Sequence, residues 1–301
     1  MKKCKVSMAL GRLQDLSNEK LAIDAAKKIG ADGIDFGFYV HSVRKENDLY
    51  TRGEDAVWEY YTDLKKYADS IGIEIPQTHG RFFGYGISPE ENEIFTRDAI
   101  LDSIATGALG AKYCVIHTPP INKIGDRFTA EEMFKINEEL VSIMLPYARK
   151  YGFKIALETH GDAKTYGKME FFGYPENLIE GIERIERNCD AKGLIAICVD
   201  TGHTNLGVPY GLPSVPEVIR MLGDRVEVLH LHDNDTSRDQ HLIPCLAKID
   251  WKETFAALGD IGFDGWYNLE NDFDQFGDDF MVETAEFSVK VMRHLCKTYV
   301  K

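Results

Sequence analysis

The sequence predicts a single α/β domain over residues 1–301, folded as a (β/α)8 barrel (a TIM barrel). Three observations predict it. The length of 301 residues suits one barrel of this kind. A unit in which a helical stretch ends at a glycine and a short apolar strand follows occurs seven times. No linker or low-complexity tract divides the chain.

The glycines that end these units recur at regular intervals. Their successive spacings are 42, 38, 42, 41, 30 and 39 residues, and the positions are Gly30, Gly72, Gly110, Gly152, Gly193, Gly223 and Gly262. Glycine suits the end of a helix because the residue after the last turn often takes a positive φ. With the opening run 4–9 counted as the first strand, the repeat gives eight strands.

The predicted helices support this alternation. The first runs from about Ser17 to Ile29 and carries Leu21, Ala22, Ala25, Ala26 and Ile29 on one face. Later helices begin at the capping-box sequences 88–91 and 129–132. Short apolar strands alternating with amphipathic helices are typical of parallel βαβ units, and eight of them favour a closed barrel. An open sheet would usually carry a glycine-rich phosphate loop after its first strand, and 9–12 is not such a loop.

Charge and composition narrow the functional classes. The chain carries 35 basic and 49 acidic residues, a net charge of −14. We therefore expect no nucleic-acid partner and no anionic membrane partner. The sequence has neither the ~18 consecutive apolar residues of a membrane span nor the apolar core of a signal peptide. The six cysteines show no paired spacing, so we expect buried free thiols in the cytoplasm. The oligomeric state stays open, a homo-oligomer included.

Six successive strands end in a histidine or a carboxylate at nearly the same depth. Counted from the repeat glycines, these residues lie six to eight positions further on: His79, His117, Glu158, Asp200, His230 and Glu270. The carboxyl ends of barrel strands form one rim, where the active sites of such barrels lie. Three imidazoles and three carboxylates around one centre would repel or protonate each other without a cation. This ligand mixture suits manganese, zinc, cobalt or iron better than magnesium, so the sequence predicts a divalent-metal site.

Other polar residues lie close to these strand ends. His203 follows Asp200 by three positions, and His232 alternates with His230 along one strand, so that both point to the same face. Asp239 and His241 lie in the loop after the seventh strand. We treat them, with His79 and His117, as residues that bind substrate or support the metal.

At these residues the sequence resembles the xylose isomerase-like barrel superfamily, which contains sugar isomerases, ketose 3-epimerases, inosose dehydratase and endonuclease IV. The most specific stretches are Ala156-Leu-Glu-Thr-His160, Val199-Asp-Thr-Gly-His203 and His230-Leu-His-Asp-Asn-Asp235, with 249–251 after them. The last resembles a signature of proteins described as sugar phosphate isomerases or epimerases. The resemblance implies a metal held by Glu158, Asp200, His230 and Glu270. It favours His230 because the family ligand opens an H-x-x-D run, but the run from His232 to Asp235 also fits, and the choice stays open.

The resemblance implies a metal-dependent isomerase or epimerase acting on a sugar or sugar phosphate. Such an enzyme removes a proton next to a carbonyl, and a divalent cation stabilises the resulting enediolate. Glu158 and Glu270 would then transfer protons, as the two glutamates of the 3-epimerases do. Four aromatic residues could form the apolar wall on which a sugar stacks: Trp251, Trp266, Phe36 and Phe82.

Three alternatives remain. An endonuclease IV-like phosphodiesterase would use His79 and His117 for one extra zinc ion, and His203, Asp239 and His241 for another. Against it stand the acidic charge, the stretch 7–9 in place of G-x-H on the first strand, and the absence of a glycine-rich turn in 242–248. That last departure also weakens the substrate contacts expected of an isomerase. An inosose-type dehydratase and a non-catalytic sugar-binding barrel are the other two.

Overall fold

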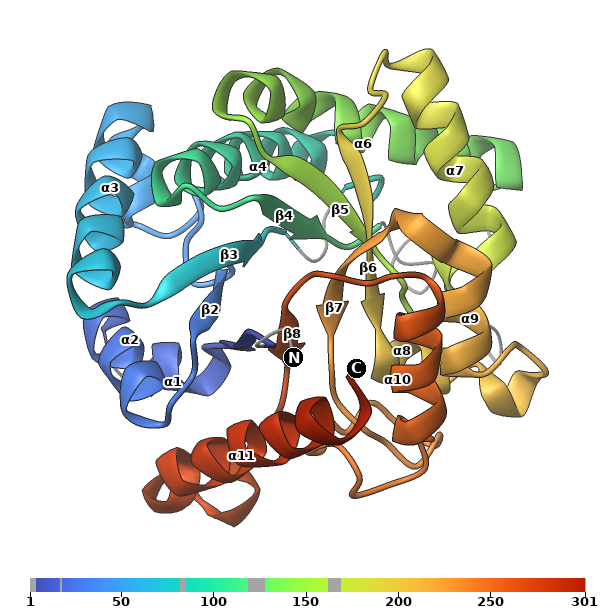
Figure 1. Cartoon of the computed structure of the whole chain (residues 1–301). Coiled ribbons are helices and arrows are strands. Elements are labelled where there is room, and N and C mark those ends of the chain that lie inside the picture. Colours follow the sequence, from blue (N-terminus) through green and yellow to red (C-terminus); the bar gives the residue numbers. More distant parts are fainter. Residues whose placement is uncertain (1–3, 17, 82–84, 119–127, 162–168, 301) are drawn as a thin grey trace.

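The computed structural model describes residues 4–16, 18–81, 85–118, 128–161 and 169–300. Eight parallel strands stand at its centre and helices surround them (Figure 1). The strand order is β7-β6-β5-β4-β3-β2-β1-β8, and a parallel bridge between Leu231 and Leu269 joins the two edges. The sheet is thus closed on itself, and the predicted TIM barrel is confirmed.

The elements alternate along the chain as the repeat requires. The strands are β1 Val6–Ala9, β2 Gly33–Gly37, β3 Glu74–His79, β4 Tyr113–Ile116, β5 Lys154–Glu158, β6 Ile195–Asp200, β7 Val226–His230 and β8 Tyr267–Leu269. The α-helices are α1 Gly11–Leu16, α2 Glu19–Lys28, α3 Glu54–Ile71, α4 Pro89–Leu109, α6 Ala130–Tyr151, α7 Pro175–Asn188, α8 Thr201–Asn205, α9 Val215–Leu222, α10 Trp251–Asp260 and α11 Met281–Tyr299.

The glycine at the end of each repeat has the conformation that the sequence predicts. All seven take a positive φ, between 61° at Gly223 and 86° at Gly30. A side chain with a Cβ atom would be strained at these positions, so glycine suits the turns that lead into the next strand. The predicted helix end at Gly193 is wrong, because α7 already ends at Asn188 and Gly193 lies in the turn before β6.

The helix starts agree with the predictions in part. Thr129 and Glu132 form a reciprocal capping box at α6. Ser88 caps α4 through the Glu91 amide, but the Glu91 side chain pairs with Arg44 instead of returning to the cap.

The predicted face of the first helix is wrong at one position. Leu21 is 56% exposed, and Ile23 is buried together with Ala22 and Ala26. Helix α2 begins at Glu19, after the cap Asn18, and turns this narrower stripe towards the barrel. Leu21 lies beyond the edge of that stripe, a rotation that periodicity alone does not determine.

The interior of the barrel has two unlike halves. On β4 to β7 a separate apolar cluster fills it: Tyr113, Val115, Ala156, Ala196, Cys198 and Val228. On β8, β1, β2 and β3 the buried residues are polar: Asn268, Ser7, Asp35 and Gln77. The polar half places hydrogen-bonding groups directly beneath the ends of the strands.

Two expectations from composition can be compared with the structure. In the part of the chain that the structure describes, no helix has both the length and the hydropathy to span a membrane. All six cysteines are free thiols, as expected, but only Cys114, Cys198 and Cys296 are buried. Cys245 is exposed because it lies in the long loop between β7 and α10.

Candidate metal centre

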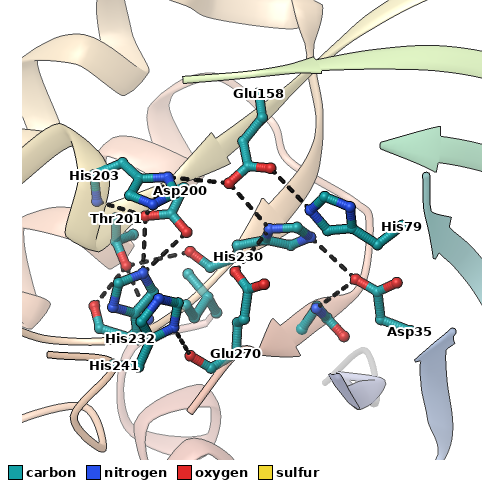
Figure 2. Close-up of polar contacts among 12 residues, drawn as sticks. Asp35, His79, Glu158, Asp200, Thr201, His203, His230, His232, His241 and Glu270 are labelled. Atoms are coloured by element: carbon teal, nitrogen blue, oxygen red, sulfur yellow. Dashed lines mark hydrogen bonds and ion pairs between the residues drawn. The ribbon is translucent and has the colours of Figure 1, made fainter. Parts of the chain in front are cut away.

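The six residues predicted at the strand ends lie together at the carboxyl end of the barrel. Figure 2 shows five of them, and the sixth, His117, contacts Glu158 at 2.9 Å. His79, Glu158, Asp200 and His230 are the last residues of β3, β5, β6 and β7. His117 follows β4 and Glu270 follows β8 at once. All are buried except Glu270, whose side chain is 20% exposed. A shared strand polarity therefore brings residues from six separate units to one rim.

Four of these residues form a compact group of ligand atoms. Glu158, Asp200, His230 and Glu270 each offer one atom, and the four atoms all lie within 4.8 Å of one another. His230 Nδ1 lies 2.9 Å from Glu270 Oε2 and 3.4 Å from Glu158 Oε1. This is the set that the sequence analysis predicts for the metal.

Glu158 is enclosed by histidines on both sides of its carboxylate. Its Oε2 lies 2.9 Å from His117 Nε2 and 3.2 Å from His79 Nε2. Its Oε1 lies 3.1 Å from His203 Nδ1. Burial by itself would raise the pKa of the Glu158 carboxyl, but the neighbouring His117 and His230 hold that pKa well below its usual range. Both oxygens of the Glu158 carboxylate thus face histidines, and the lowered pKa favours its ionised form.

A third group lies on the side of α8 and the loop after β7. Asp239 Oδ2 is 3.2 Å from His203 Nε2 and 2.9 Å from His241 Nε2. Burial would lower the pKa of His241, but the hydrogen bond and the charge of Asp239 raise it to about 10. The His241 Nδ1–H donates to the backbone carbonyl of Glu270 at 2.8 Å, which ties this group to the end of β8.

The geometry separates His230 from His232, the two residues that the sequence leaves open. His230 directs Nδ1 towards Glu158 and Glu270. His232 instead places Nε2 2.9 and 3.0 Å from the two oxygens of Asp200, and its ring stacks on His241 at 4.0 Å. His230 therefore faces two of the candidate carboxylate ligands, Glu158 and Glu270, and His232 faces the third, Asp200. His232 also forms a candidate ligand group of its own with His241 and Glu270.

The D-T-G-H run needs a glycine at position 202 because the His232 ring packs closely against it. A Cβ atom at position 202 would lie 1.9 Å from Cε1 of His232. The absent side chain therefore lets the His232 ring lie flat against the start of α8. There it reaches Asp200, which is also the N-cap of that helix.

Asp233 shapes the loop that carries Asp239 and His241. Its carboxylate accepts the backbone N–H groups of Cys245, Ala247 and Ile249, each at 3.1 Å, and the indole N–H of Trp251 at 2.9 Å. A two-way backbone bridge between Asp233 and Leu242 fixes the residue next to His241. The aspartate of the first H-x-x-D run thus organises the loop and is not itself in a ligand group among the described residues.

Asp35 is a member of the site that the sequence reasoning missed. It lies inside β2, 1% exposed, and its Oδ2 is 3.0 Å from His230 Nε2. Counting forward from each glycine finds residues at strand ends, and Asp35 lies deeper in the barrel. The signal available was a carboxylate inside an otherwise apolar strand, which needs a buried partner.

The aromatic wall proposed for sugar stacking does not form from the described candidates. Phe36 is buried against Phe38 and Tyr61, and Trp251 is buried with its N–H on Asp233. Trp266 precedes β8 at the opposite end of the barrel, beside Lys5. Phe82 lies outside the described residues. A cavity of about 130 Å³ beside Glu270 is lined instead by residues that include Ala9, Leu10, Asp35, Tyr39 and Asp272.

Comparison with known proteins identifies the family. Residues 23–291 match the family described as xylose isomerase-like TIM barrel. The chain belongs to this family.

One similar sequence and two similar structures illustrate how far the likeness extends. An uncharacterized protein of Methanocaldococcus jannaschii is 30% identical over 176 residues, which is 58% of this chain and 55% of that protein, so the match spans about half of the relative. The zinc-bound IolI protein is similar in structure, with a TM-score of 0.74, 18% identity and 99% of each chain covered. A D-tagatose 3-epimerase-like protein has a TM-score of 0.71 at 18% identity over 98% of this chain and 99% of that one. At these identities the two structures show the shared fold.

The donor set of this xylose isomerase-like barrel fits a divalent transition metal. Glu158 Oε1, His230 Nδ1 and Glu270 Oε2 are buried and converge: they contact each other as ion pairs at 2.9 and 3.4 Å, and none makes a hydrogen bond of normal geometry within the described residues. Buried polar atoms rarely lack a partner, and carboxylate oxygens with an imidazole nitrogen are the ligands that zinc, manganese and cobalt take. Besides Asp200, these three atoms would hold the ion.

Proposed function

We propose that this chain is a divalent-metal-dependent sugar isomerase or epimerase, with the ion held by Glu158, Asp200, His230 and Glu270. One observation carries the proposal: at the rim of the barrel, His230 Nδ1 faces the buried carboxylate oxygens Glu270 Oε2 at 2.9 Å and Glu158 Oε1 at 3.4 Å, and Asp200 completes a group of four ligand atoms within 4.8 Å of one another. Family membership supports it, and so does the likeness in fold to a protein described as D-tagatose 3-epimerase-like.

The bound ion would polarise the substrate carbonyl and stabilise the negative charge that develops when the neighbouring carbon loses its proton. The side chains supply the proton transfer. Glu270 lines the cavity and its side chain is 20% exposed, so a substrate in that cavity can reach it. Glu158 is fully buried and has histidines on both oxygens. We therefore assign the substrate-facing proton transfer to Glu270 first, and to Glu158 only if substrate displaces its histidine contacts.

This difference bears on the type of reaction. One carboxylate that returns a proton to the adjacent carbon on the same face produces isomerisation. Epimerisation at one carbon requires proton donors on opposite faces, and thus a second acid such as Glu158. The position of the exchanged proton distinguishes these two outcomes.

The test is exchange of carbon-bound protons with deuterated water, followed by NMR over ketoses, aldoses and their phosphates with manganese, zinc or cobalt added. Glu270→Gln should lower exchange by ~10²–10⁴-fold, the usual contribution of general acid–base catalysis. Glu74→Gln is the matched control, because Glu74 begins β3 at the other end of the barrel and pairs with Lys5. Exchange at the native rate in Glu270→Gln would contradict the assignment. If no sugar exchanges, the isomerase proposal fails, and a dehydratase assay on inosose-like ketones comes next.

A metal-dependent phosphodiesterase is the second candidate, and the further ligand groups favour it. His79 joins Glu158 and His230 in one group, and His203, Asp239 and His241 form another. Adjacent metal ions ~3.5–4 Å apart are typical of enzymes that cleave phosphate esters. About three equivalents of metal, together with cleavage of abasic-site DNA or a nitrophenyl phosphodiester, would support it. About one equivalent and no cleavage would exclude it.

A further inference from the structure

A buried polar layer crosses the barrel beneath the candidate metal centre. Its members lie on four adjacent strands and are 0–2% exposed: Asn268 on β8, Ser7 on β1, Asp35 on β2 and Gln77 on β3. Ser7 pairs in register with Asn268, and Asp35 with Gln77. The facing half of the barrel is apolar. Four polar residues in this position need hydrogen-bond partners, because burying polar groups is costly unless they are paired.

The layer converges on one oxygen of Asp35. Oδ2 accepts the Gln77 Nε2–H at 2.8 Å and the Asn268 Nδ2–H at 3.2 Å. The Asn268 side-chain oxygen in turn accepts the Ser7 hydroxyl at 2.8 Å, which fixes the orientation of that amide. Two amide donors, one on β3 and one on β8, therefore hold the Asp35 carboxylate in a single position.

The third contact of the same oxygen is His230. Asp35 Oδ2 and His230 Nε2 are 3.0 Å apart, although the two residues are 195 positions apart in the chain (Figure 2). An ionised carboxylate only accepts hydrogen bonds, so His230 Nε2 must carry the hydrogen. The other ring nitrogen, Nδ1, faces Glu158 and Glu270 and lacks a hydrogen bond in the described structure.

We propose that Asp35 is a positioning residue that keeps the hydrogen of His230 on Nε2 and thereby presents Nδ1 to the metal ion. A carboxylate on the far nitrogen fixes both the tautomer and the ring orientation of a metal-binding histidine. This inference rests on the metal centre of the proposed function, but not on the reaction that the centre catalyses.

The first test uses the metal alone as the probe. Chelator-treated protein is titrated with zinc, cobalt or manganese against a competing indicator, and thermal unfolding and circular dichroism monitor the fold. Asp35→Ala should weaken metal affinity by about 10–100-fold, the usual effect of losing such a partner. Asp35→Asn should weaken it less, because the amide oxygen can still accept from Nε2. Glu74→Gln is the control, because Glu74 begins β3 at the other end of the barrel, pairs with Lys5 and is not part of the polar layer, so it should leave the affinity unchanged.

The second test needs no substitution at Asp35 and so cannot be confounded by misfolding. In zinc-loaded native protein labelled with ¹⁵N-histidine, the His230 signal, assigned with His230→Gln, should show a protonated Nε2 and a metal-bound Nδ1. Zinc on Nε2, or unchanged affinity in a folded Asp35→Ala, would overturn the inference. Normal metal binding without activity on any sugar would overturn the proposed function alone. Native protein that binds no divalent ion would overturn both.

Discussion

Replacing Gly202 with alanine should displace the His232 ring and break its hydrogen bond to Asp200. The new Cβ atom would lie 1.9 Å from Cε1, 2.3 Å from Nδ1 and 2.6 Å from Nε2 of His232. That ring cannot easily move aside, since it is fully buried, stacks on His241 at 4.0 Å and bonds to Asp200 at 2.9 Å. Overpacking costs roughly 1–3 kcal/mol, and losing a hydrogen bond to a charged group costs about 1.5–3 kcal/mol. We expect a loss in the free energy of unfolding of roughly 3–5 kcal/mol.

The assay is urea unfolding of metal-free protein, followed by tryptophan fluorescence, for Gly202→Ala, His232→Ala and the double variant. If the clash with His232 is the cause, Gly202→Ala should cost much less in the His232→Ala background. Gly259→Ala is the control, because it lies in α10 with nothing within 4 Å of its added Cβ. It should be neutral or stabilise by up to about 1 kcal/mol. An equal cost of Gly202→Ala in both backgrounds would refute the reasoning.

Three further predictions concern charge, the loop and a helix cap. The raised pKa of His241, about 10 against an ordinary 6.5, means that metal-free protein gains stability from this group below pH 6.5 and loses it progressively as the pH rises to about 10. His241→Asn should flatten that slope in urea unfolding at several pH values, whereas His294→Gln, on the exposed face of α11, should not. Trp251→Phe removes one donor from Asp233 and should cost about 1–3 kcal/mol. Hydrogen exchange at the amides of Cys245 and Ala247 should become faster, and unchanged protection would contradict the role given to Asp233. Thr129→Ala breaks the capping box of α6 and should cost about 1 kcal/mol in urea unfolding, while no loss would show that this cap is dispensable.

The fold was predictable because the glycines that separate its helices from its strands are determined by local backbone conformation. Each repeat glycine has a positive φ that its local turn requires, at or shortly after the end of a helix, so the seven positions are visible without any knowledge of tertiary contacts. The rim residues follow by counting along strands of similar length. The rotation of α2 was not predictable in this way, since the choice between Leu21 and Ile23 depends on how the helix packs against the barrel.

The missed parts of the site depend on contacts between distant strands. Asp35 acts on His230 across the barrel, and no spacing within β2 indicates that partner. The sequence likewise contains two H-x-x-D runs, which begin at His230 and His232. Because both histidines point to the same face of the strand, spacing alone does not choose between them. Only the packing of Gly202 against His232, and of Asp35 against His230, distinguishes the two histidines.

The candidate ligands come from many strands, so they become available at different times while the chain is being synthesised. Glu270 lies after β8, the last strand of the barrel to be synthesised, while Asp35 lies on β2, its second strand. The edges of the sheet meet only when the backbone of Leu231 pairs with that of β8 next to Glu270. A nascent chain, or one truncated before β8, therefore lacks part of the ligand set and has His230 on an open edge. If this set binds an ion tightly, the bound ion would therefore report that the barrel is closed through β8.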